Sequence, residues 1–204
     1  MESDIDMPCP ICSKSGQLKM ISDINDIPYF GEHTQVTLMC NDCGWRQTDF
    51  IPAEGKKPGA SSLFISGEEE LRARVVRSSS CTISIPELEL EVNPGTSSPG
   101  YVSNIEGVID RFIQVVEMVL KDLDDPTQVG AATRILLVLY EVKEGRGSGI
   151  TVEFLDPHGH SMVLHENTVN RELTKEELES LPVGPEPPVI EKQSTSIHGE
   201  EVID

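Results

Sequence analysis

Apolar positions between residues 105 and 123 recur at spacings of three and four, which is the period of an amphipathic α-helix. A capping box of Ser103 and Glu106 predicts where this helix begins. A second helix is predicted to begin just afterwards, with Asp125 as its N-cap and Pro126 in its first helical position. Two helices with so short a link between them pack antiparallel.

The second helix contains a run from Ile135 to Leu139 that is apolar on every side. Such a run predicts either a helix that is buried on two faces or a helix that leaves apolar surface for a partner. We expect burial on two faces, because core packing explains most apolar stripes. The two helices together predict an antiparallel hairpin over residues 103–144.

Elsewhere the apolar period is two, and β-branched residues are frequent, which predicts β-strands. The strands predicted in this way cover residues 35–39, 81–86, 88–92, 149–155 and 162–164. Asp156-Pro-His-Gly159 fits a type I turn, so the last two of these strands are expected to form a hairpin. The fold class is therefore predicted to be mainly β with an α-helical hairpin.

Composition divides the 204 residues into three parts. Residues 55–62 are rich in Gly, Lys and Ser, which is typical of a flexible joint between domains. The joint separates a first module, residues 1–54, from a β domain with the helical hairpin, residues 63–181. Residues 182–204 are rich in Pro, Glu and Ser without an apolar period, which predicts a disordered acidic tail.

The chain carries 35 Asp and Glu against 16 Lys and Arg, a formal net charge of −19. General binding to a phosphate backbone depends on clustered Lys and Arg, so the negative charge argues against a nucleic-acid partner. The first residues lack the basic and apolar regions of a secretory signal, and no apolar run has the length of a membrane span. We therefore expect a cytoplasmic protein, in which thiols stay reduced.

Four of the five cysteines form two Cys-x-x-Cys pairs, Cys9 with Cys12 and Cys40 with Cys43. Paired thiols at this spacing are typical of a structural zinc site, and the strand between the pairs gives the layout of a zinc ribbon. Iron could occupy the same four thiolates. A site filled by four protein ligands has no open position for water or substrate, so we expect the metal to hold shape rather than to catalyse.

A second cluster of possible ligands follows the predicted strand at residues 149–155. It consists of Asp156, His158, His160, His165 and Glu166. His158, His160 and Glu166 would share one face of a strand, as in a metal-dependent oxygenase-like enzyme with two His and one carboxylate. The alternative is a hairpin turn whose histidines point to solvent, and the Pro and Gly of the turn favour it.

Several segments, taken in order, resemble the ZPR-type zinc-finger proteins. They are Cys9-Pro-Ile-Cys12, Ile27-Pro-Tyr-Phe-Gly-Glu32, Cys40-Asn-Asp-Cys-Gly44, Val75-Val-Arg-Ser78, Ile85-Pro-Glu-Leu88, Ile105-Glu-Gly107 and Asp156-Pro-His-Gly-His-Ser161. The sequence departs from the family pattern at His160, where Asn is usual, and at His33. Neither departure touches the four thiols.

The resemblance implies an N-terminal zinc ribbon followed by a double-stranded β-helix, a jelly-roll-like domain that carries the helical hairpin. One such module resembles the archaeal form of the family. The resemblance also implies binding to translation elongation factor 1-alpha, a GTPase, as a folding or assembly factor. The aromatic pair Tyr29 and Phe30, between the two cysteine pairs, is our candidate for partner contact, because aromatic residues are enriched at interfaces. Packing of the pair onto the β domain is the alternative.

These observations predict a non-enzymatic protein with one structural zinc ion that binds a protein partner. Two other functions stay open on the sequence alone. One is the oxygenase-like enzyme that would use His158, His160 and Glu166, and the other is a zinc-ribbon nucleic-acid factor.

Overall fold

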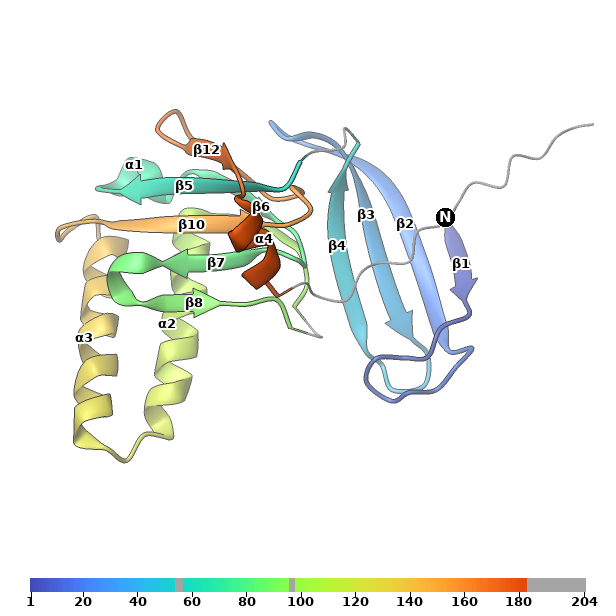
Figure 1. Ribbon diagram of the computed structural model, residues 1–204, viewed down its shortest axis with the longest axis horizontal. Coiled ribbons are helices and arrows are strands. Elements are labelled where there is room, and N and C mark those ends of the chain that lie inside the picture. The colour runs from blue at the N-terminus through green and yellow to red at the C-terminus, as the bar shows by residue number, and fades with distance from the viewer. Residues whose placement is uncertain (54–56, 96–97, 183–204) are drawn as a thin grey trace, which may run out of the picture.

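The computed structural model describes residues 1–53, 57–95 and 98–182. The joint predicted at residues 55–62 lies partly outside this range, and the predicted acidic tail lies outside it beyond residue 182. Two parts follow one another along the described chain, a small sheet and a larger β domain with helices (Figure 1).

The first part is an antiparallel sheet of four strands in the order β1-β2-β3-β4 (Figure 1). The strands are β1 (Glu2–Ile5), β2 (Leu18–Ile27), β3 (Gly31–Cys40) and β4 (Arg46–Pro52). Strand β2 pairs with β3 from Leu18 opposite Cys40 to Ile27 opposite Gly31. This register places Cys40 at one end of the sheet and the β2–β3 turn, which carries Tyr29 and Phe30, at the other.

The first part has a small core of its own. Its buried side chains are Ile5, Cys9, Leu18, Met20, Val36, Leu38, Cys40 and Trp45. Two of these eight are cysteines of the predicted metal site, so apolar burial alone gives this sheet little stability.

The second part contains two antiparallel sheets. One has the strand order β12-β5-β10-β7-β8 and the other has the order β11-β6-β9. The strands are β5 (Gly59–Ile65), β6 (Arg74–Arg77), β7 (Thr82–Ile85), β8 (Leu90–Val92), β9 (Tyr101–Asn104), β10 (Ile150–Asp156), β11 (Met162–Leu164) and β12 (Val169–Glu172). Every second residue of β10 is buried, from Ile150 to Asp156, as the period of two predicts.

The hairpin predicted from residues 149–155 and 162–164 is wrong, although both strands exist. Strand β11 pairs with β6, with Val163 opposite Val75, while β10 pairs with β5 and β7. Both edges of β10 are therefore occupied, and the chain crosses to the other sheet. The turn itself is present: Gly159 has φ +68°, and its N–H donates to the carbonyl of Asp156 at 3.1 Å.

The helical hairpin is formed by α2 (Ile105–Lys121) and α3 (Pro126–Lys143). Asp125 caps α3 as predicted, since its carboxylate accepts hydrogen bonds from the N–H groups of Thr127 and Gln128. The predicted cap of α2 is wrong by one residue. Asn104, the last residue of β9, is the N-cap, and its side chain accepts from the N–H of Gly107 at 2.9 Å. Two short helices complete the fold, α1 (Glu68–Leu71) and α4 (Lys175–Ser180).

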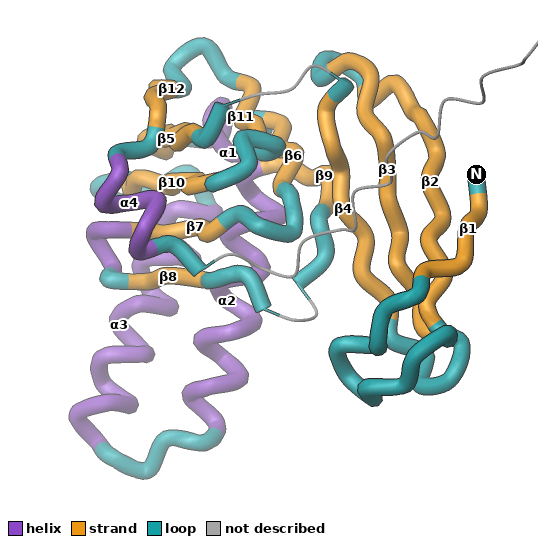
Figure 2. Tube along the Cα trace, turned by 45° about the vertical axis from the view of Figure 1, so that its right-hand side comes forward, coloured by secondary structure: helices purple, strands orange, loops and turns teal. Residues whose placement is uncertain are grey.

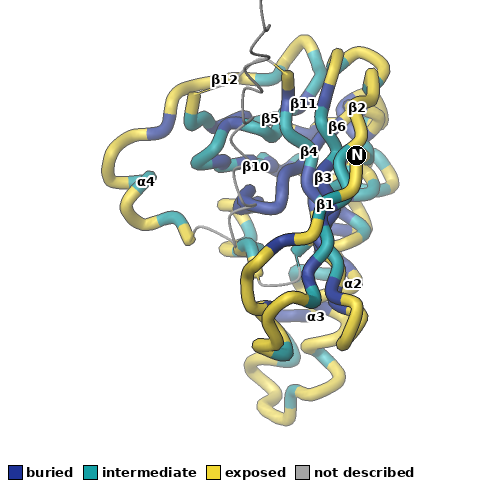
Figure 3. Tube along the Cα trace, turned by 90° about the vertical axis from the view of Figure 1, so that its right-hand side faces the viewer, coloured by how far each residue is buried: buried dark blue, intermediate teal, exposed yellow. Residues whose placement is uncertain are grey.

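The expectation that α3 is buried on two faces is wrong. Leu139 is fully buried, but Leu137 is 59% exposed and Tyr140 is 41% exposed. Residues two apart lie about 200° apart around a helix, so Leu137 faces solvent while Leu139 faces the core. Figure 3 shows that the far end of the hairpin, where α2 and α3 meet, is exposed.

A single apolar core joins the larger sheet to the helices. It includes Leu63 of β5, Ile85 of β7 and Phe154 of β10, packed with Ile109 and Phe112 of α2. No helix in the described ranges is long and apolar enough to cross a membrane.

The two parts meet where β4 lies beside β9 (Figure 2). The N–H of Gly100 donates to the carbonyl of Thr48 at 2.6 Å. Asp49 of β4 is buried, and its two carboxylate oxygens accept from the N–H and the hydroxyl of Ser79, each at 2.8 Å. The junction is therefore buried and hydrogen-bonded, and it fixes the small sheet against the β domain.

Candidate metal centre

Two loops at one end of the small sheet carry the four cysteines of the predicted zinc site. Cys9 and Cys12 lie in the loop after β1, Cys40 ends β3, and Cys43 lies in the turn that leads to β4. Each loop is closed by its own backbone: the N–H of Ser13 donates to the carbonyl of Cys9 at 2.8 Å. The N–H of Gly44 donates to the carbonyl of Cys40 at 3.1 Å. Gly44 has φ +75°, a conformation that favours glycine.

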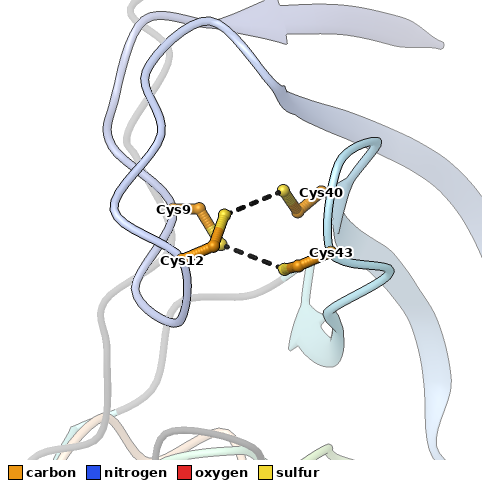
Figure 4. Close-up of side chains that lie close together, drawn as sticks. All are labelled: Cys9, Cys12, Cys40 and Cys43. Atoms are coloured by element: carbon orange, nitrogen blue, oxygen red, sulfur yellow. Dashed lines mark hydrogen bonds between the residues drawn. The ribbon is translucent and has the colours of Figure 1, made fainter.

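The four sulfur atoms converge on one point between the loops (Figure 4). The Sγ atoms of Cys9 and Cys43 lie 3.7 Å apart, those of Cys12 and Cys40 lie 3.8 Å apart, and all four lie within 4.8 Å of one another. A tetrahedral zinc ion with Zn–S bonds of about 2.3 Å requires sulfurs about 3.8 Å apart. The geometry therefore fits one metal ion.

The thiols of the site differ in pKa. Backbone hydrogen bonds from Lys14 and Trp45 lower the pKa values of Cys12 and Cys43, but burial and hydrogen bonds from the neighbouring thiols outweigh them, raising the pKa of Cys12 and raising that of Cys43 to about 12. Burial disfavours ionisation of Cys9, but backbone hydrogen bonds from Cys12 and Ile11 outweigh it and lower the pKa of this thiol to about 7. Lys14 and Asp42 form an ion pair of 2.6 Å between the two loops. This ion pair helps to hold the two loops together.

The second predicted cluster does not form a metal site. His158 and His160 lie close, with ring centroids 5.6 Å apart, but Glu166 does not join them. Within residues 1–53, 57–95 and 98–182, the four cysteines are the one group of three or more possible ligands whose donor atoms converge. The oxygenase-like hypothesis therefore lacks the site that it needs.

Asp156, a candidate ligand on the sequence, instead accepts the hydrogen bonds of a buried network. Its carboxylate accepts from the hydroxyls of Ser78 at 2.7 Å and Ser80 at 2.9 Å. It also accepts from the N–H groups of His158 at 2.9 Å and Ser161 at 2.7 Å. The run Ser78-Ser-Ser80 is the signal of this network in the sequence, because buried hydroxyls require hydrogen-bond acceptors. This network fixes the turn after β10.

The remaining cysteine, Cys81, is fully buried in the β domain. Burial, its largest cause, raises the pKa of this thiol to about 12. This thiol therefore stays protonated and is packed in the β domain core.

His33 and His160, the two departures from the family pattern, both bury a ring nitrogen that lacks a hydrogen-bond partner among the described residues. Burial lowers the pKa of His160, against the attraction of Asp156 and Asp49, while His158 and His33 lower it further. The neutral ring is therefore the form that the fold accepts.

We expect this histidine to make the protein less stable in mild acid. The unfolded chain binds a proton to His160 below about pH 6.5, whereas the folded chain resists it, so the free energy of unfolding falls as pH drops below that value. His160→Asn should remove the contribution of this histidine to the dependence of the free energy of unfolding on pH. Urea unfolding of both proteins at about pH 7.5 and about pH 5 measures it. An equal slope in both would contradict the prediction.

Of the two aromatic residues in the β2–β3 turn, Tyr29 is mainly exposed to solvent and Phe30 packs toward the β domain. Tyr29 is 76% exposed, adopts φ +74°, and lies with its ring 4.4 Å from the guanidinium carbon of Arg74. Phe30 is half-buried and lines a cavity together with Arg72 and Val102 of the β domain. Packing onto the β domain thus accounts for Phe30 but leaves the Tyr29 ring open to a partner.

A metal-held sheet joined to a β domain with a helical hairpin defines a modular zinc-finger protein. Residues 3–57 match the ZPR1 zinc-finger domain, and residues 69–181 match the ZPR1 jelly-roll domain. The chain therefore belongs to the ZPR1 family. The resemblance, the mainly β fold with a zinc finger before a jelly-roll domain, and a site for one structural zinc ion are all confirmed.

Similar proteins occur in archaea and eukaryotes. The chain is 41% identical over 180 residues to an uncharacterized ZPR1-like protein of Pyrococcus horikoshii, covering 87% of this chain and 80% of that one. It is 36% identical over 184 residues to a ZPR1-like protein of Methanocaldococcus jannaschii, covering 90% and 92%. The match to the zinc finger chaperone of Schizosaccharomyces pombe, 30% over 112 residues, covers 54% of this chain and 23% of that protein.

Proposed function

We propose that this protein is a non-enzymatic, cytoplasmic zinc-finger protein that binds translation elongation factor 1-alpha as a folding or assembly factor. Cys9, Cys12, Cys40 and Cys43 are the zinc ligands, and the ion holds the shape of the finger. The family supports a role with a protein partner, since one relative is named a zinc finger chaperone. The identity of the partner, elongation factor 1-alpha, rests on the resemblance to ZPR-type proteins.

The observation that carries the proposal is the conformation of Tyr29. A tyrosine at φ +74° is strained, and its ring stays 76% exposed at the tip of the turn although it contacts the guanidinium of Arg74. Strained residues concentrate at binding sites, and tyrosine is frequent among the residues that dominate interface energies. The zinc ion contributes indirectly, by stabilising the sheet whose strands β2 and β3 carry this turn.

The charge of the chain speaks for a protein partner over nucleic acid. With a formal net charge of −19, the surface repels a phosphate backbone. A zinc ribbon that binds nucleic acid requires the opposite balance.

Tyr29→Ala should weaken binding to elongation factor 1-alpha by more than about 1 kcal/mol, at least fivefold in Kd, because the ring would lie near the centre of the interface. Phe30→Ala should act in the same direction. Calorimetry with the purified factor, in its GDP and GTP forms, measures both effects. The matched control is Ile24→Ala, which removes a 69% exposed apolar side chain from β2, away from the turn.

Zinc content and unfolding of each variant show whether the fold is intact. No heat with either nucleotide form at concentrations of tens of micromolar would rule out the proposed partner. Equal weakening by Tyr29→Ala and Ile24→Ala would show that the turn is not the contact.

A further inference from the structure

A groove of about 440 Å³ lies between α2 and the edge of the larger sheet. Ile83 of β7 and Val92 of β8 form one wall, and Phe112, Val115 and Met118 of α2 form the other. Val115 is 43% exposed and Met118 is 59% exposed, so the helix wall is open to solvent. The volume is within the range of sites that bind ligands, about 300–1,000 Å³.

Arg77 lines this groove and is an unusual cation. Its side chain is buried, at 3% exposure, and donates only to uncharged acceptors: the Ser98 hydroxyl at 2.9 Å, the Pro99 carbonyl at 3.2 Å and the Cys81 carbonyl at 2.7 Å. Among the described residues, its Nε has no hydrogen-bond partner and no carboxylate forms an ion pair with it. A buried charge without an anion is costly, so a negative group in the groove would be stabilised.

A second arginine stands at the same place. The guanidinium carbon of Arg111, an exposed residue of α2, lies 4.0 Å from the centre of the Tyr101 ring, and that of Arg77 lies 5.7 Å from it. Within the described ranges Arg111 forms no ion pair either. In a chain with a formal net charge of −19, two arginines around one tyrosine make a local positive site on an apolar wall.

The groove also borders a free strand edge. Strand β8 is the last strand of its sheet, paired with β7 on one side and with no strand of the described chain on the other. An extended peptide can add to such an edge through backbone hydrogen bonds while its side chains enter the adjacent groove.

We propose that this groove binds an extended segment of a protein partner in which apolar side chains alternate with a carboxylate. The apolar side chains lie against Val92, Phe112 and Met118, and the carboxylate pairs with Arg77 and Arg111. A bidentate arginine–carboxylate pair supplies both energy and direction. The inference deepens the proposed function, on which it rests, because the segment belongs to the protein that is being folded or assembled.

The probe is a short fluorescent peptide in which valine alternates with glutamate, compared with the same peptide carrying glutamine in place of glutamate. Anisotropy with the full-length, zinc-loaded protein should show saturable binding of the acidic peptide and about tenfold weaker binding of the amide peptide. Equal binding of the two peptides, or binding of neither, would overturn the proposal. Displacement of the bound acidic peptide by a low concentration of inorganic phosphate would also overturn the proposal, because it would indicate a simple anion site.

The variants place the peptide in the groove. Arg111→Gln and Met118→Glu should each weaken binding of the acidic peptide about tenfold or more, since one removes the charge partner and the other puts a repelling charge in the wall. Two matched controls should leave it unchanged. Arg134→Gln removes an exposed arginine of α3, and Val119→Glu changes an exposed apolar residue of α2; neither residue lines the groove. Equal effects of variants and controls would refute the assignment.

Binding of elongation factor 1-alpha is measured separately with the same variants. Peptide binding without factor binding overturns the proposed partner and leaves the groove assigned. Factor binding that Arg111→Gln and Met118→Glu do not weaken, together with no peptide binding, overturns the groove and leaves the proposed partner in place.

Discussion

Removal of zinc is expected to unfold the finger while the β domain stays folded. Four thiolate ligands contribute on the order of 10–16 kcal/mol of apparent binding free energy, and this free energy is folding free energy where the core is small. The finger core has eight buried side chains, of which Cys9 and Cys40 belong to the site itself. Without the ion, the two loops keep the Lys14–Asp42 ion pair but lose the metal–sulfur bonds between them.

The chain carries its own probe for this experiment. Trp45 is the single tryptophan, and it is buried in the finger core at 8% exposure. Addition of a chelator should shift its fluorescence to that of an exposed indole and should open residues 1–54 to protease. Elemental analysis before chelation should give one zinc per chain, and iron or a second metal would contradict the assignment.

Cys40→Ser tests the same site without a chelator, and Cys81→Ala is the matched control. Cys81 is a buried thiol of the β domain and is not one of the four converging sulfurs, so its loss should leave zinc content unchanged. Retention of zinc, of buried Trp45 fluorescence and of protease resistance in Cys40→Ser would show that the four thiols are not the ligands.

Unfolding of the finger should change the stability of the β domain only through the contacts at the junction. Its core joins Leu63, Ile85 and Phe154 to α2 and does not include the finger. Unfolding of β4 would, however, leave the N–H and hydroxyl of Ser79 without Asp49. We therefore expect the β domain to become less stable by about 1–3 kcal/mol, the range for a buried polar group that loses its partner.

The sequence predicted those features that depend on local spacing. Two Cys-x-x-Cys pairs specify a metal site because the spacing itself brings two thiols to one ion, and Asp125 with Pro126 specifies the start of α3 because the cap needs only its own first turn. The pairing of β11 with β6 could not be predicted from the sequence. It depends on β5 and β7 having taken both edges of β10, which no local pattern records.

The sites that the sequence missed are those that long-range packing assembles. Arginine is usually exposed, and only the fold shows that Arg77 is buried without an ion pair to any carboxylate of the described residues. Ser78 and Asp156 are 78 residues apart in the chain, and only the packing of β6 near the end of β10 brings them to 2.7 Å. Composition and periodicity contain neither fact.

Replacement of Asp156 is expected to have the largest effect on the β domain. This carboxylate is 2% exposed and accepts four hydrogen bonds, from Ser78, Ser80, His158 and Ser161. Asp156→Ala leaves these donors without their acceptor in a buried place, where each unsatisfied group costs about 1–3 kcal/mol before the structure relaxes. We expect a loss of about 3 kcal/mol or more in the free energy of unfolding.

The same carboxylate predicts a dependence on acid. Burial would raise the pKa of Asp156, but hydrogen bonds from Ser161, Ser78, the His158 N–H and Ser80 outweigh it and lower the pKa below its ordinary value. Its contribution to stability is therefore fully present above the unfolded pKa, about 3.9, and is lost as pH falls from there through the folded pKa. Asp156→Ala should flatten the stability curve in that window.

Urea unfolding followed by circular dichroism measures both effects, and Trp45 fluorescence reports the finger separately, so that acid release of zinc is not mistaken for loss of the β domain. Glu153→Ala is the matched control. It removes a carboxylate of the same strand that accepts one long hydrogen bond, from the Ser84 hydroxyl at 3.4 Å, and it should cost less than about 1 kcal/mol. An Asp156→Ala protein as stable as Glu153→Ala, with the acid slope of the parent, would mean that the serine cluster does not depend on this carboxylate. The turn after β10 would then be held by its backbone alone.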